Sequence, residues 1–463
     1  MIAQDVLLGR PLARTRETTL QATDEGGRAA RWILGTLLVS VIVFEAATVD
    51  PLLTFGTYLH RGIGSWTGLP IIFSPLEVLL ILGVLVSLGS AALGASSLRA
   101  KAIRLPMGLF VLALIFGFAR GFVGGGDSYI AMWEVRYLLY VPACFFIVRT
   151  ALRTREHVAH LLRVGLLATL LFATEGAWRK IALVNTGALG TVPEFYYEHE
   201  DVIFLASFLV LLVAAFLYKA SARLRVFSAL ASPVLLYTLL SSGRRSGVIV
   251  LLVGLLLLGL TVIVLRPKAF LASVVPVLLV AGAYIGLFWN ASGIVGQPAR
   301  AIRSLYEPDA RDAASNIYRV IETYDISLTI HDDPLLGVGF GREFNMTATL
   351  ADLSWWPFWR YETHNNVLWM WMKTGGAGYL AFWILVGSAI SRAAFAAKRF
   401  RDQELRAAGI FCLVSIVGVI VFAYVDLGLV SGRVMVFFGT VLGLISVVDA
   451  LGRASSADLR VRT

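Results

Sequence analysis

Three residues in this sequence are of types suited to proton transfer and phosphate binding. His364 begins the run His-Asn-Asn-Val-Leu, where a polar segment meets a long apolar stretch. An imidazole ordinarily has a pKa of about 6.5, so it can accept a proton near neutral pH. Arg244 and Arg245 stand together in a polar turn between two apolar stretches. Guanidinium groups stay charged at physiological pH and match two phosphate oxygens at once, so this turn could hold a phosphate or pyrophosphate.

The composition shows that a membrane must position these residues. Apolar residues make up 58% of the 463 residues, charged residues make up 15%, and the mean hydropathy is +0.77. Too little polar surface remains to solvate a soluble globule, so we predict an all-α polytopic membrane protein. Twelve apolar stretches are each about the length a helix needs to cross a bilayer: 32–49, 70–94, 106–123, 130–149, 157–176, 202–218, 226–241, 247–265, 270–288, 367–390, 408–426 and 433–450.

The basic residues predict the orientation of these spans. An even number of spans places both termini on one side, and the segments on that side hold 24 of the 40 lysines and arginines, whereas the short opposite loops hold seven. Positive charge collects on the cytoplasmic side, so we expect a plasma (inner) membrane protein with both termini cytoplasmic. The net charge of +10 is spread over short runs and does not indicate nucleic acid.

The predicted spans divide the chain into five parts. Residues 1–31 read as a disordered cytoplasmic arm that lacks the apolar core of a signal peptide. The other parts are helices 1–9 over 32–288, an outer loop over 289–366, helices 10–12 over 367–450 and a cytoplasmic tail over 451–463.

The outer loop is predicted to fold as a soluble cap. Between 289 and 363 it holds six arginines and ten acidic residues, so it is net acidic in a basic chain. Apolar residues spaced four, three and four apart predict a helix over 312–330, which Asp312 or Ser315 could cap. Glycines at 337, 339 and 341 predict a flexible backbone that could approach a ligand closely.

Disulfide and metal chemistry are not predicted. Cys144 and Cys412 both fall inside predicted spans. The closest histidine pair, His157 and His160, lies at a predicted helix start, and we interpret it as structural. No motif implies a metal or another cofactor.

Each charged candidate also has a structural interpretation. Arg244 and Arg245 could reach toward lipid headgroups, and His364 could bond loop carbonyls. Because basic groups are costly at the outer face, we favour an anion site at the turn. Glu134 and Arg136, near the outer end of one span, could join that site or pair with each other or with neighbours.

The order of these features resembles the O-antigen ligase family, which also includes O-antigen and exopolysaccharide polymerases. The resemblance rests on the arginine turn, on Arg319 and the run Pro-Leu-Leu-Gly-Val-Gly-Phe-Gly at 334–341, and on His364-Asn365-Asn366 followed by Gly375 and Gly378. It is most specific over residues 235–380. It implies an all-helical membrane glycosyltransferase with a partly helical periplasmic cap.

The resemblance also implies an activity and a site. Such proteins move a glycan from an undecaprenyl-pyrophosphate carrier to an acceptor on the outer face of the membrane. By position, His364 is the catalytic residue, Arg319 is the loop arginine, and Arg245 or Arg244 is the hairpin arginine, with Arg245 fitting the spacing better. Fixed arginines would stabilise the pyrophosphate leaving group while His364 accepts the acceptor's proton. The implied partners are the lipid-linked glycan donor, a lipid-anchored or saccharide acceptor and membrane lipids.

Three functional hypotheses follow. A ligase would attach a finished glycan to its acceptor, and a polymerase would join repeat units by the same chemistry. A flippase or transporter would use the arginines to bind a lipid-linked anion, but the cap and the lack of a visible inverted repeat disfavour it. Ligase and polymerase both need a pyrophosphate site and a base, so they remain alternatives, with the ligase as our leading hypothesis and a protein acceptor left open.

Overall fold

The computed structural model describes residues 27–45, 55–69, 71–92, 103–186, 197–218, 222–265, 267–400 and 402–461, and this part of the chain is helical with no strand. Residues 1–26 of the predicted arm lie outside the described residues, and a helix over 27–43 already includes the end of that arm. At the other terminus α17 (Gly432–Val461) runs as one helix through most of the predicted tail.

The predicted fold class is confirmed. Each of the twelve apolar stretches overlaps a helix, and nine helical segments of the described chain are long and apolar enough to cross a membrane. The number twelve stays a prediction. Besides α17, the helices are α4 (Pro75–Ala92), α5 (Arg104–Val123), α6 (Ser128–Leu138), α7 (Tyr140–Ala151), α8 (Arg155–Trp178) with its π-helical continuation η1 (Arg179–Val184), α9 (Asp201–Leu217), α10 (Ala222–Ser241), α11 (Arg245–Leu265), α12 (Pro267–Leu287), α15 (Asn366–Arg399) and α16 (Gln403–Val425), with the short α2 (Phe55–His60) and α3 (Gly64–Thr67).

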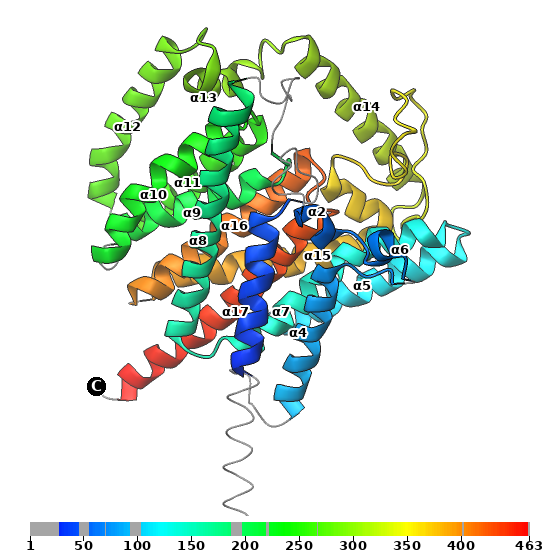
Figure 1. The fold of residues 1–463 in the computed structure, drawn as a ribbon, viewed down its shortest axis with the longest axis horizontal. Coiled ribbons are helices and arrows are strands. Elements are labelled where there is room, and N and C mark those ends of the chain that lie inside the picture. The colour runs from blue at the N-terminus through cyan, green and yellow to red at the C-terminus, as the bar shows by residue number, and fades with distance from the viewer. Residues whose placement is uncertain are drawn as a thin grey trace, which may run out of the picture.

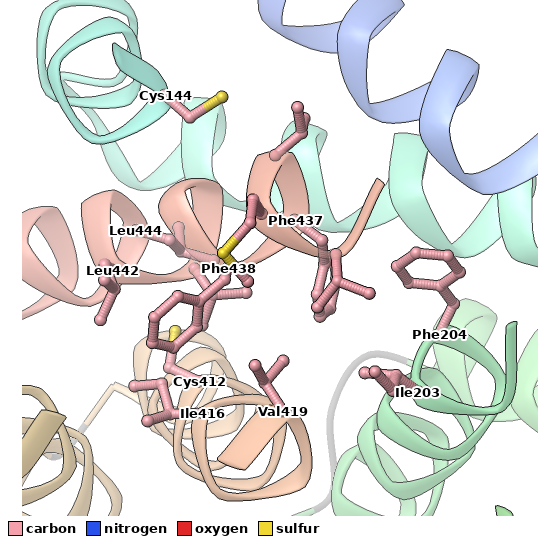
Figure 2. Close-up of a cluster of buried hydrophobic side chains, with 14 of the residues drawn as sticks. Cys144, Ile203, Phe204, Cys412, Ile416, Val419, Phe437, Phe438, Leu442 and Leu444 are labelled. Carbon is pink, nitrogen blue, oxygen red and sulfur yellow. The ribbon is translucent and has the colours of Figure 1, made fainter. Parts of the chain in front are cut away.

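The core of the bundle forms where α9, α16 and α17 meet α7. Figure 2 shows Phe204 of α9 near Phe437 of α17, with ring centroids 5.1 Å apart, and both cysteines among the buried side chains. These helices are apolar all round because they are surrounded by other helices. In contrast, α11 leaves a stripe of leucines exposed, which includes Leu256 at 62% exposure. Such a stripe fits a helix face that contacts lipid.

The predicted cap contains two helices, α13 (Gly293–Arg303) and α14 (Ala310–Asp332), which lie over one end of the bundle in Figure 1. The helix predicted over 312–330 is therefore present and longer at both ends. Its predicted cap residues were wrong, because Asp309 accepts the N-terminal hydrogen bond from the backbone N–H of Asp312 at 2.8 Å.

The glycine run after α14 packs against other backbone segments. Gly339 has a φ of 89°, and a Cβ there would lie 2.2 Å from the backbone nitrogen of Gly121 in α5. A Cβ on Gly337 would lie 2.5 Å from the nitrogen of Gly375, where α15 has a non-helical residue. These glycines thus allow a close approach of chain to chain, whereas we had expected an approach to a ligand. They fix the loop between α5 and α15, and so help to position the start of α15.

Candidate functional site

His364 lies directly before α15 and pairs with a buried carboxylate of the cap. Glu322 of α14 accepts a hydrogen bond from the His364 backbone N–H at 2.8 Å, and both of its oxygens lie 3.2 Å from His364 Nδ1. Glu322 is 1% exposed, so this carboxylate has little competing water. Because an ionised carboxylate only accepts, Nδ1 carries the proton and Nε2 keeps its lone pair. The pair therefore orients an imidazole that can take up a proton at Nε2.

The two asparagines after His364 hold the start of α15. Asn365 is the N-cap, and its side-chain oxygen accepts from the backbone N–H of Leu368 at 3.1 Å. Asn366 is buried, donates to the carbonyl of Thr363 at 2.7 Å and accepts from the N–H of Leu429 at 2.6 Å. These bonds fix the turn that carries His364 and tie it to the loop between α16 and α17.

That loop carries Asp426, which is the centre of a second group of polar contacts besides the His364–Glu322 pair. His199 Nδ1 lies 2.9 Å from Asp426, and His199 Nε2 lies 2.9 Å from a guanidinium nitrogen of Arg244. Since a guanidinium only donates, Nε2 accepts and Nδ1 donates to Asp426. Arg319 of α14 also approaches Asp426, with a nitrogen-to-oxygen distance of 3.9 Å. Two of the predicted arginines thus converge on one carboxylate.

The charges of Asp426 and Arg244 follow from their surroundings. Burial alone would raise the pKa of Asp426, but the hydrogen bond from His199 and the charge of Arg319 lower that pKa to about 2. Burial lowers the pKa of Arg244 to about 10, against the effect of the Asp426 charge, so this arginine still carries its charge at neutral pH. Within the described part of the chain, the Nε of Arg319 is buried without a hydrogen-bond partner.

Arg245 points to a different partner from Arg244. Its guanidinium lies 3.4 Å from the side-chain oxygen of Asn316 and 3.4 Å from that of Asp312, both on α14. The sharp turn before it uses Gly243 at a φ of 71°. The structure therefore places Arg245 between the hairpin and the cap helix, and Arg244 beside His199.

A cavity of about 480 Å³ is lined by residues of both polar groups, the one at His364 and the one at Asp426. His364 lines it on one side and His199 with Asp426 on the other. Arg244 contacts His199 and Arg319 approaches Asp426, although neither arginine is among the residues that line the cavity. The remaining wall includes Trp133, Tyr137, Trp356, Phe358, Glu362 and a set of ionic residues that contains Glu198, Glu200 and Arg433. A proton acceptor and a group of arginines thus flank one space.

A buried ionic network stiffens the floor of this cavity. Arg433 is 1% exposed, and its guanidinium lies 2.7 Å from Glu198 and 2.6 Å from Asp201. Arg179 pairs with Glu45 at 2.5 Å, and Glu45 also accepts from the Glu198 backbone N–H at 3.1 Å. Breaking one partner of such a pair would leave a charge buried without compensation. We therefore interpret these residues as support for the site.

Arg136, predicted as a further pyrophosphate ligand, is neutralised elsewhere. It forms an ion pair with Glu77 of α4 and lies over the ring of Trp133, with its guanidinium carbon 4.4 Å from the ring centroid. Glu134, its expected partner, instead pairs with Lys373 of α15 at 2.7 Å. The structure does not bring Arg136 into the cavity beside His364.

Arg136 instead lines a larger groove next to the cavity. The groove has a volume of about 1380 Å³ and lies between α4, the α2–α3 segment and the α6–α7 pair. Apolar side chains such as Ile81, Leu85 and Met132 line it. The groove and the cavity share four wall residues: His60, Trp133, Tyr137 and Tyr140. A lipid whose apolar chain lay in the groove could therefore place its polar headgroup at the cavity.

Several site residues were missed from the sequence. Glu322 was counted only among the acids of the loop, and Asp426 was assigned to the end of a span. His199 follows a segment outside any predicted motif, and Glu362 looked like part of a polar approach to His364. No group of three or more metal-ligating side chains occurs among the described residues.

Comparison with known families agrees with this geometry. Residues 230–383 match the family model described as O-antigen ligase. The matched segment contains Arg244, Arg245, Arg319, Glu322 and His364, whereas His199 and Asp426 lie outside it. A comparison with curated protein sequences gives no significant match. The arginine turn, the cap helix and the histidine at the start of α15 thus lie within one segment that matches the O-antigen ligase family model.

Proposed function

We propose that this protein is a membrane glycosyltransferase of the O-antigen ligase type. It transfers a glycan from an undecaprenyl-pyrophosphate carrier to an acceptor hydroxyl on the outer face of the plasma membrane. The observation that carries this proposal is the His364–Glu322 pair, which faces His199 and Asp426 across one cavity with Arg244 and Arg319 behind them.

The chemistry is a single displacement. The acceptor oxygen bonds to the anomeric carbon, the bond from that carbon to the pyrophosphate oxygen breaks, and the electron pair leaves with the pyrophosphate. The acceptor's proton moves to His364 Nε2, and the Glu322 carboxylate stabilises the resulting imidazolium. Arg319 and Arg244 offset the negative charge that grows on the leaving group.

The groove beside the cavity supports a lipid-linked substrate. Its apolar wall and its position between α4 and the α6–α7 pair suit a lipid chain that enters from the bilayer. Its junction with the cavity at Tyr137 and Tyr140 would place the polar end of that lipid next to His364. A soluble substrate would have no use for an apolar surface of this size.

The test uses purified protein in vesicles with a lipid-linked glycan donor and a candidate acceptor. Wild type should transfer the glycan, and His364→Ala should abolish transfer while the protein is expressed and inserted normally. Transfer by His364→Ala at a rate near that of wild type would refute the role of His364 as the base.

Deletion of the gene separates the competing functions. Accumulation of unligated long polymer on the carrier supports the ligase, and accumulation of single repeat units supports the polymerase. Retention of the lipid-linked glycan on the inner face would instead refute transfer and favour translocation.

A further inference from the structure

Three buried ionisable residues, Lys373, Glu134 and Glu362, form a group, and one of them lines the cavity together with His364. Lys373 and Glu134 are both fully buried, and the Lys373 ammonium lies 2.7 Å from a Glu134 oxygen and donates to the carbonyl of Arg342 at 2.5 Å. The other Glu134 oxygen accepts from the backbone N–H of Gly341. Glu362 is 7% exposed, and the charges of Glu134 and Lys373 both act on it. The ammonium group thus pairs with Glu134, while Glu362 feels both charges without contacting either.

The contacts decide which carboxyl is charged. Glu134 has the ammonium ion and a backbone donor, which favour its ionised form. The Glu362 carboxyl has no hydrogen bond or ion pair with the described residues. Its burial and the nearby negative charge of Glu134 hold the pKa of Glu362 well above its ordinary value. An ionised Glu362 would be a second buried anion without its own partner, so its burial and the charge of Glu134 both favour the neutral carboxylic acid.

Glu362 lies on the wall of the cavity with His364. Aromatic rings line the same cavity: the Trp133 ring centroid lies 6.3 Å from that of Phe358 and 6.2 Å from that of Tyr137. A neutral carboxylic acid both donates and accepts hydrogen bonds, as sugar hydroxyls do. Aromatic rings supply the flat apolar surface on which the C–H face of a sugar can pack.

We propose that Glu362, in its neutral form, and the rings of Trp133 and Phe358 form a sugar-binding subsite that holds the acceptor sugar next to His364. Glu362 donates its O–H to one sugar oxygen and accepts from a neighbouring hydroxyl. Only the identification of the bound sugar as the acceptor rests on the proposed function. The sugar-binding subsite itself does not.

The first test measures the carboxyl directly. Infrared difference spectra of wild type against Glu362→Gln, in detergent at neutral pH, should show the loss of a carboxylic acid C=O band. Glu343→Gln is the matched control, because Glu343 lies on the same loop but is 38% exposed and pairs with Arg360 at 3.0 Å. Adding the acceptor saccharide should shift the Glu362 band. A difference spectrum that shows only carboxylate bands, or no band shift with saccharide, would overturn the subsite.

The second test measures transfer. Glu362→Met fills the space but removes the hydrogen bonds, so the acceptor KM should rise about tenfold with the donor KM unchanged. Glu362→Gln keeps a donor and an acceptor, so it should lose only roughly two- to fourfold. Glu343→Met should match wild type. Equal damage in Glu362→Gln and Glu362→Met, or a wild-type acceptor KM in Glu362→Met, would overturn the assignment.

The two tests also separate this inference from the proposed function. A wild-type protein that transfers no glycan, yet shows the saccharide-dependent band shift, refutes the transferase and supports the subsite. Normal transfer without any band shift supports the transferase and refutes the subsite.

Discussion

The Glu322–His364 pair makes the most direct prediction about catalysis. Glu322→Gln keeps the shape of the side chain but removes the charge that orients and stabilises the imidazole. Glu322 accepts from His364 at 2.8 Å and 3.2 Å in a position that is 1% exposed. A hydrogen bond to a charged group at such a site contributes about 1.5–3 kcal/mol. If that amount is lost in the transition state, kcat should fall roughly 10- to 150-fold.

The assay is steady-state transfer by purified variants, with folding followed by thermal unfolding in detergent. Glu322→Gln should lower kcat and leave the donor KM within about twofold, because Glu322 does not line the cavity. The matched control is Glu343→Gln, which should leave both parameters at wild-type values. An unchanged kcat in Glu322→Gln would refute the proposed role of this carboxylate.

A double variant tests whether the two residues act as a unit. His364→Ala removes the group through which Glu322 acts, so any slow residual transfer measured in His364→Ala should not fall further when Glu322→Gln is added. Losses that multiply would show that Glu322 contributes by a route other than His364, such as holding the cap in place.

Three further predictions test the arginines, the orientation and the response to acid. Arg244→Lys and Arg319→Lys should fold normally and lose transfer by roughly 1–3 kcal/mol of transition-state stabilisation, because lysine lacks the planar fork; full rates in both would make the arginines structural. In intact cells, with any outer membrane permeabilised, an impermeant maleimide should label Ala351→Cys in the cap but not Lys398→Cys at the end of α15, since both native cysteines are buried; the reverse pattern would invert the orientation. Burial and the nearby charge of Arg433 lower the pKa of His60 to about 4, so the unfolded chain binds more protons between pH 6.5 and 4 and stability should fall over that range, by about 3 kcal/mol in total. His60→Gln should remove this part of the acid sensitivity in melting curves, and an unchanged pH dependence would contradict the assignment.

The helices were predictable because their signal is local. Each apolar stretch is long enough to span a bilayer and overlaps a helix in the structure. The turn at Gly243 and the start of α15 at Asn366 also lie where the sequence places them. Hydropathy reports which segments leave water, and that property needs no knowledge of neighbours.

The partners of the site residues were not predictable because they are set by packing. Glu322 precedes His364 by 42 residues and His199 precedes Asp426 by 227 residues. Their carboxylates resemble ordinary acids of a loop or a span end. Arg136 shows the same limit, since its neighbour Glu134 was an obvious partner, yet it pairs with Glu77 on another helix. A single sequence gives the charges but not the pairs.

One helix of the cap connects both halves of the site. Glu322 of α14 holds His364, Arg319 approaches Asp426 from the same helix, and Asp312 reaches Arg245 in the hairpin. The loop that follows α14 is hydrogen-bonded to it. Buried Asp325 of α14 accepts from the backbone N–H groups of Thr347 and Ala348 at 3.1 Å and 2.9 Å. The position of α14 on the membrane helices therefore sets where His364 lies relative to the arginines. Without α14, His364 would lose its hydrogen bonds to Glu322 and Arg245 would lose its contact with Asp312, so the geometry of the site depends on the cap as well as on the membrane helices.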